Sequence, residues 1–139
     1  MKKLTLFVSA FVMCAFAANA QCDKKIKWNA SKMEMVDTSG NVRSKDGIIT
    51  VITGDGKIVV TAAEDNEQLS GGITDYVCNW KDRNNGSMSF KSLLTDTHGK
   101  ERHATITIEA KDGKTVMVFS AEEELTKMQL PIDAYEEIN

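Results

Sequence analysis

The stretch Ala104-Thr-Ile-Thr-Ile-Glu-Ala110 alternates strictly between apolar and polar residues. Its apolar residues occupy positions 104, 106, 108 and 110, and Thr or Glu fills the positions between them. Because successive side chains of a β-strand point to opposite faces of the sheet, this period of two predicts a half-buried strand. The same period recurs elsewhere in the chain and favours an all-β fold.

Short polar turns flank this strand and recur along the chain. Lys111-Asp112-Gly113-Lys114 links it to a second apolar run, and Gly54-Asp55-Gly56 separates two β-branched runs. Short connections that contain Gly or Asn are typical of β-hairpins, since these residues adopt positive φ at low cost. We expect strands near residues 26–36, 48–53, 57–62, 73–81, 87–95, 101–110, 114–120 and 127–133.

Strands joined by such short turns predict an antiparallel meander. A meander of about eight strands can close into a barrel, complete or partly open, or form a two-layer β-sandwich. We favour the barrel, because sandwiches usually need long crossing connections. No amphipathic helix of about ten residues or more stands out, and the sequence permits one helical turn at each of residues 63–68 and 122–127.

Two local irregularities are predicted within the strands. The alternation of residues 26–30 is out of phase with that of Met33 and Met35. A β-bulge near residues 31–32 would turn both sets toward the core. Pro131 has no amide to donate, so the last strand is expected to end there or to lie at an edge.

Residues 1–20 have the composition of a secretory signal peptide. Two lysines precede the mostly apolar segment 4–18, and Ala18-Asn19-Ala20 matches a small-x-small cleavage site. Fifteen helical residues span about 22 Å, less than the roughly 30 Å of a hydrocarbon core, which disfavours a retained anchor. A lipid anchor on Cys22 is disfavoured because Gln21 precedes it. We therefore expect an exported protein, periplasmic or secreted, with no transmembrane span after cleavage.

Cleavage would leave residues 21–139 as a single β-domain. Two lysines leave with the signal peptide, so the net charge moves from −3 to −5, with 15 basic against 20 acidic residues. A mildly acidic domain is a poor binder of nucleic acid or of anionic membrane surfaces. The length also excludes a doubly wound cofactor enzyme with a second domain.

Cys22 and Cys78 are the two cysteines of the predicted mature chain, since Cys14 lies in the signal peptide. Export favours their oxidation to a disulfide. The bond would enclose about 57 residues, a loop for which the chain-entropy estimate is roughly 4 kcal/mol. A redox or metal role is disfavoured, because the sequence has no Cys-x-x-Cys motif and no His near either cysteine.

Few groups in the sequence predict catalysis. Gly-x-Ser-x-Gly and phosphate-binding Gly-rich loops are absent, so we assign no catalytic residue, no metal ligand and no cofactor. His98 and His103 are the two histidines, and their spacing across a turn is not that of a metal site. A small envelope hydrolase that uses His98 or His103 with a carboxylate remains an alternative.

Methionines and aromatic residues mark the predicted binding surface. Five methionines remain after cleavage, and all of them fall in predicted strands. Methionine adapts to irregular apolar surfaces and is frequent in promiscuous pockets, although core filling is the simpler explanation. The sharper prediction is a ligand-binding pocket lined by Trp28, Met33, Met35, Trp80, Met88, Phe90 and Met117.

Two segments resemble those of a known group of proteins. They are Cys22-Asp-Lys-Lys-Ile-Lys-Trp-Asn-Ala-Ser-Lys-Met-Glu34 with Asp37-Thr-Ser-Gly40, and Tyr76-Val-Cys-Asn-Trp-Lys81. With the cleavage site, they resemble small exported proteins of unknown function from Bacteroidota, a resemblance that covers most of the mature chain and implies no activity or site residues. The early Trp28 also resembles that of lipocalin-type barrels, although Ile26 stands where those proteins have Gly.

The leading hypothesis is an exported, non-catalytic β-domain of the bacterial envelope. It would bind a small apolar ligand or an envelope protein through a face or cavity near Trp28 and Trp80. One alternative is the small hydrolase described above. The other is a structural or assembly module that pairs through an edge strand such as 127–133.

Overall fold

The computed structural model describes residues 22–138 and is all β over that range. The predicted signal peptide, residues 1–20, lies outside the described residues. The strands are β1 Lys25–Val36, β2 Val42–Gly54, β3 Lys57–Ala62, β4 Glu67–Gly72, β5 Thr74–Asp82, β6 Asn85–Thr95, β7 Glu101–Lys111, β8 Lys114–Ala121, β9 Lys127–Ile132 and β10 Ala134–Ile138.

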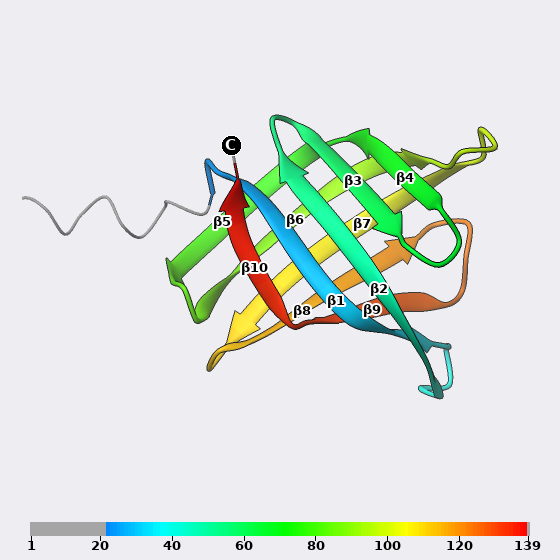
Figure 1. Cartoon of the computed structure of the whole chain (residues 1–139), viewed down its shortest axis with the longest axis horizontal. Coiled ribbons are helices and arrows are strands. Elements are labelled where there is room, and N and C mark those ends of the chain that lie inside the picture. The colour runs from blue at the N-terminus through cyan, green and yellow to red at the C-terminus, as the bar shows by residue number, and fades with distance from the viewer. Residues whose placement is uncertain (1–21, 139) are drawn as a thin grey trace, which may run out of the picture.

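The sheet closes on itself as a barrel. Strands β1, β2, β3, β4, β6, β7, β8 and β9 pair in that order, and β9 pairs with β1 (Figure 1). The two other strands extend the walls, because β5 pairs with β6 and β10 pairs with β1. The described pairings are all antiparallel. The predicted closed barrel is therefore confirmed, and the two-layer sandwich is not the fold.

The turns gather at two ends of the barrel. The distal end, on the right of Figure 1, carries the turns at residues 37–41, 63–66, 96–100 and 122–126. The proximal end, on the left, carries the start of β1 and the turns at residues 55–56, 83–84 and 112–113.

The helical turns that the sequence permits at 63–68 and 122–127 do not form, since residues 22–138 contain no helix. Residues 63–66 form a turn, and β4 follows it directly. Sequence reasoning missed β4 because Glu67-Gln-Leu-Ser-Gly-Gly72 shows little β-propensity. The segment becomes a strand because it pairs with β3 over the whole length of that strand.

The bulge predicted for the first strand is present, whereas the edge predicted at Pro131 holds for only part of β9. The register of β1 against β2 shifts between Ala30 and Lys32, which confirms the bulge, and Met33 packs against the core beyond it. Pro131 pairs with Val116 of β8, whereas the pairing of β9 with β1 ends at Gln129. The proline thus lies where one side of β9 is unpaired. The first half of β9 is paired on both sides, so this strand is not the open edge that was expected for assembly.

The two halves of the chain repeat one arrangement, which sequence reasoning did not recognise. β1 pairs with β2 on one side and with β9 and β10 on the other, while β6 pairs with β7 on one side and with β4 and β5 on the other. The turns Asp37-Thr-Ser-Gly40 and Asp96-Thr-His-Gly99 also correspond. In each, one aspartate oxygen accepts two backbone amides, and the glycine φ is 85° in the first and 83° in the second. The barrel is therefore built from two similar meanders, β1–β5 and β6–β10.

Large apolar side chains fill the barrel interior. Trp28 and Phe90 are the largest of the fully buried side chains, and isoleucines from β1, β3 and β7 surround them. The interior of an eight-stranded barrel is just wide enough for side chains to fill. Any binding surface of this barrel is therefore expected at an end or on the outside.

Candidate functional site

The two tryptophans of the predicted pocket lie in the core near the proximal end. The Trp28 ring centroid is 6.4 Å from that of Trp80 and 4.8 Å from that of Tyr135. Trp28 Nε1 donates a 3.0 Å hydrogen bond to Thr53 Oγ1, and the Tyr135 hydroxyl donates to the Arg83 carbonyl oxygen at 2.7 Å. Because Arg83 belongs to the turn between β5 and β6, Tyr135 joins β10 to the opposite wall of the barrel. We call Trp28, Trp80 and Tyr135 the proximal cluster. It closes the proximal end of the barrel.

The other predicted pocket residues divide between the core and the distal end. Met88, Phe90 and Met117 are buried in the core with the tryptophans. Met33 and Met35 are half-buried near the distal end of β1. The structure thus places five of the seven predicted residues in packed interior, and Met33 is the one that lines the hollow described next.

An apolar hollow of about 150 Å³ opens at the distal end, and we call it the distal hollow. Its apolar lining consists of Met33, Ile48, Ile49, Val60, Ala62, Leu69 and Met128. Its charged lining consists of Lys45, Asp46, Glu64, Asp65 and Glu67. An apolar cavity of about this volume in another protein holds benzene, so one six-carbon group matches the space.

Strand register places these side chains together. The bulge in β1 turns Met33 inward, and Val60 of β3 pairs directly with Leu69 of β4. Met128, at the start of β9, is the register partner of Met35. Sequence reasoning missed Val60, Leu69 and Met128 as site residues. The alternation of β3 was visible, but without β4 the wall that faces it was missing.

The carboxylates of the distal hollow outnumber its cationic side chains. Four acidic residues and one lysine line it. The ion pairs within the described part of the chain are Lys25–Asp55, Lys32–Glu34, Arg102–Glu124 and His103–Glu123, and none of them includes a residue of the hollow. We call the apolar part of this lining the floor of the hollow and the charged part its rim. The rim carries an excess of negative charge.

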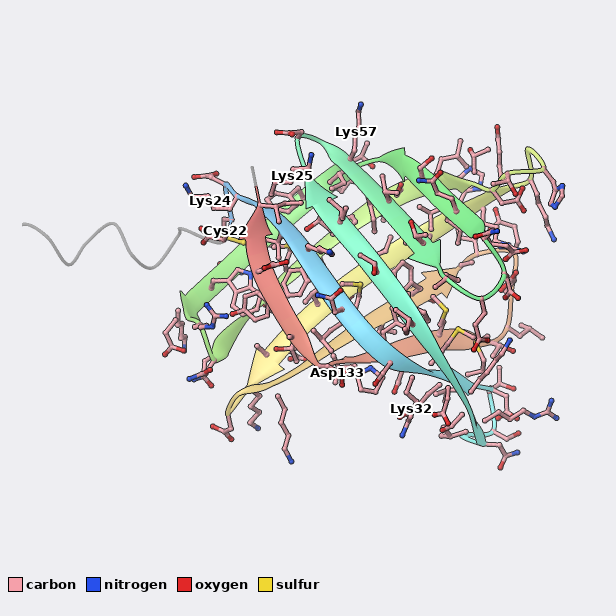
Figure 2. The ribbon with its side chains drawn as sticks, viewed as in Figure 1. Cys22, Lys24, Lys25, Lys32, Lys57 and Asp133 are labelled. Carbon is pink, nitrogen blue, oxygen red and sulfur yellow. A yellow bond between two sulfur atoms is a disulfide. The ribbon has the colours of Figure 1, made fainter. Side chains whose placement is uncertain are left out.

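Cys22 and Cys78 are joined by a disulfide, as predicted. Figure 2 shows it as a yellow bond beside Cys22, where the chain enters β1. The Tyr76 hydroxyl also donates a 2.9 Å hydrogen bond to the Cys22 carbonyl oxygen. Burial of the phenol, aided by the charge of Asp23, raises the pKa of Tyr76 above its usual value. These contacts fix the start of the described chain to β5.

The histidines are exposed, and one of them has a carboxylate partner. His98 lies in a turn, whereas His103 Nδ1 is 2.6 Å from Glu123 Oε1, and the His103 amide also donates to the Glu123 carboxylate. The hydrogen bond that the protonated imidazole donates to Glu123, together with the charges of Glu123, Glu122 and Glu101, raises the pKa of His103. The imidazole is 63% exposed. Such exposed pairs act mainly as weak surface contacts, but His103 also lines a hollow together with Glu122, so the hydrolase alternative stays a prediction.

Replacing Glu123 with glutamine should lower the pKa of His103 toward its ordinary value of 6.5, because the bonded negative charge is lost. The raised pKa of His103 means that its contribution to stability is complete below 6.5 and is lost as pH rises through the folded-state value. The lowered pKa of Glu123 means that its contribution is complete above 4.5 and is lost on acidification. The pair therefore contributes most between pH 4.5 and 6.5. An NMR titration of the imidazole carbon resonances measures the shift. An unchanged His103 titration in E123Q would contradict this assignment, and His98 is the internal control.

Within 22–138, no three His, Cys, Asp or Glu residues gather in a way that could hold a metal ion. The described chain also has no helix with the length and apolar character needed to cross a membrane.

Comparisons with protein-family models, with curated proteins and with solved structures find no match for this chain. The fold and the site together define a small closed β-barrel with a filled interior and an acidic-rimmed apolar hollow at one end.

Proposed function

We propose that this chain is an exported, non-catalytic binding protein of the bacterial envelope that seats the apolar group of a small ligand in the distal hollow. The observation that carries the proposal is the apolar floor of the hollow, which is open to solvent, while the largest buried side chains pack the centre of the barrel. Export is supported by the signal-like sequence of residues 1–20 and by the Cys22–Cys78 disulfide, a bond typical of oxidising compartments.

This proposal moves the binding surface away from the tryptophans. Trp28 and Trp80 are 0% and 3% exposed, so a ligand could reach them only if the proximal cluster opened. Met33 lies at the other end and is already accessible through the hollow. A ligand at the distal end needs no rearrangement of the core.

The size of the hollow sets the expected affinity. Burying a six-carbon group gives about 5 kcal/mol at roughly 0.8 kcal/mol for each methylene. That free energy corresponds to a dissociation constant of about 0.2 mM before the cost of immobilising the ligand is counted. The hollow is thus suited to one apolar group of a ligand and not to a whole lipid.

Titration with 1-octanol should shift the methyl resonances of Met33 and Met128, which line the hollow, and leave that of buried Met117 nearly unchanged. Protein labelled with 13C at the methionine methyl groups gives the readout. The Ala62→Phe variant should abolish the shifts, because the larger side chain fills the hollow. Ala134→Phe, on β10 outside the hollow, is the matched control and should bind as the unmodified protein does. The proposal fails if octanol moves neither Met33 nor Met128 up to its solubility limit.

A further inference from the structure

The rim of the distal hollow carries charge that the apolar floor does not require. We propose that the hollow selects amphiphilic cations, with an alkyl- or arylammonium head group at the rim and an apolar group of about six carbons on the floor. This inference rests on the proposed function and adds the chemistry of the ligand.

The acidic side chains reach the hollow from separate elements. Glu64 and Asp65 lie in the turn between β3 and β4, and Asp46 lies on β2. A Cβ built on Gly47 would be 3.8 Å from Glu64 Oε2, which places that carboxylate beside the β2 backbone next to Asp46. Glu64 therefore lies against the neighbouring strand β2 at the mouth of the hollow.

The chain neutralises these carboxylates only in part. Lys45 is the single basic residue of the lining, against Asp46, Glu64, Asp65 and Glu67, so the lining carries a net charge of −3. Figure 2 labels Lys24, Lys25 and Lys57 away from the distal turns on the right, whereas Lys32 is the register partner of Asp46 and forms an ion pair with Glu34 at 3.3 Å. A concave surface of one sign with low-dielectric walls focuses its field on an entering ion of the opposite sign.

Size and charge together favour a small ammonium ligand over a long peptide. A group of about six carbons fills the available space. A single ammonium group at the mouth then faces carboxylates from β2, β4 and the turn between β3 and β4. The floor matches the apolar group of such a ligand in size, and the rim matches its ammonium group in charge. The hollow therefore favours this class of ligand.

Three probes with the same tail test the selection: octylammonium, 1-octanol and octanoate, each titrated at pH 7 with the methionine methyl readout. Octylammonium should bind about tenfold more tightly than octanol, and octanoate should bind more weakly than either. The preference for octylammonium should fall toward unity at 1 M salt, because the rim is exposed to solvent. Equal binding of all three probes overturns the charge selection and leaves the proposed function standing. Absence of binding by all three overturns both.

The triple variant Glu64→Gln, Asp65→Asn, Glu67→Gln tests how much the rim charges contribute to the affinity, independently of the apolar floor. It should bind octylammonium no more tightly than octanol, while its affinity for octanol stays unchanged. Glu136→Gln with Glu137→Gln, on exposed positions of β10, removes negative charge away from the hollow and should keep the preference. A triple variant that still prefers octylammonium overturns the role of the rim. A Lys-Leu dipeptide amide that binds more tightly than octylammonium would replace the small amphiphile by a basic peptide as occupant.

Discussion

Replacing Cys22 and Cys78 together with serine should lower the free energy of unfolding by about 4 kcal/mol and the melting temperature by about 10–20 °C. The disulfide closes a loop that contains β1, β2, β3 and β4, with a sequence separation of 56 between the cysteines. Without it the unfolded chain gains the conformational freedom of that loop. The folded state also loses a link between β1 and β5, which do not pair with each other in the described sheet. Thermal unfolding followed by circular dichroism measures the change.

Two controls separate the disulfide from its surroundings. Reductant should bring the unmodified protein close to the double variant and leave the double variant unaffected. Tyr76→Phe removes the hydroxyl that bonds to Cys22 and keeps the disulfide, so it should cost only about 1 kcal/mol. If the double serine variant melts at the same temperature as the oxidised protein, the bond does not stabilise this barrel.

Alternation in the sequence was enough to predict the barrel. A strand with one apolar face must cover a core, and a series of such strands with short turns has few ways to do so. The phase change between residues 26–30 and Met33 even located the bulge in β1. Pro131 likewise marked a position where a neighbouring strand is missing on one side. These features are local, and they can therefore be read from neighbouring residues.

Strands that form only because they pair with another segment could not be predicted in the same way. Residues 67–72 contain two glycines and little alternation, yet they pair with β3 along its full length. Residues 134–138 pair with the first half of β1, where the aromatic contact between Tyr135 and Trp28 holds them. Only the fold brings these partners together. The corresponding turns at Asp37 and Asp96 were a visible signal, since both read Asp-Thr-x-Gly, and they would have revealed the two similar halves.

The sequence pattern did not show where each residue lies along the barrel axis, and that position decides whether its side chain is in the core or in the distal hollow. Alternation shows that Trp28 and Met33 both face inward, but it does not show that one lies in the core and the other at a mouth. A methionine in packed interior and a methionine in a hollow have the same sequence pattern. The acidic turn at residues 64–67 was the better clue, because it marks the end of the barrel where solvent meets the apolar floor.

Trp28→Ala should destabilise the protein by about 3–5 kcal/mol, close to the total stability of many small domains. Trp28 is fully buried, and it contacts Trp80 and Tyr135, which come from β5 and β10. Removing its indole leaves a large cavity between the two strands that pair on one side only. Urea unfolding measured by circular dichroism gives the change without relying on tryptophan fluorescence.

Thr53→Val isolates the polar part of this effect. The valine has nearly the shape of threonine but cannot accept the hydrogen bond from Trp28 Nε1, so a buried donor loses its partner at a cost of about 1–3 kcal/mol. Trp28→Phe removes the donor and part of the ring, and in that background Thr53→Val should cost less than it does alone. Equal costs in the two backgrounds would show that the 3.0 Å bond contributes nothing to stability. A smaller cost in the Trp28→Phe background would instead show that Thr53 stabilises the barrel by accepting the hydrogen bond of the buried Trp28 Nε1–H group. The indole could then be buried without leaving its polar group unpaired.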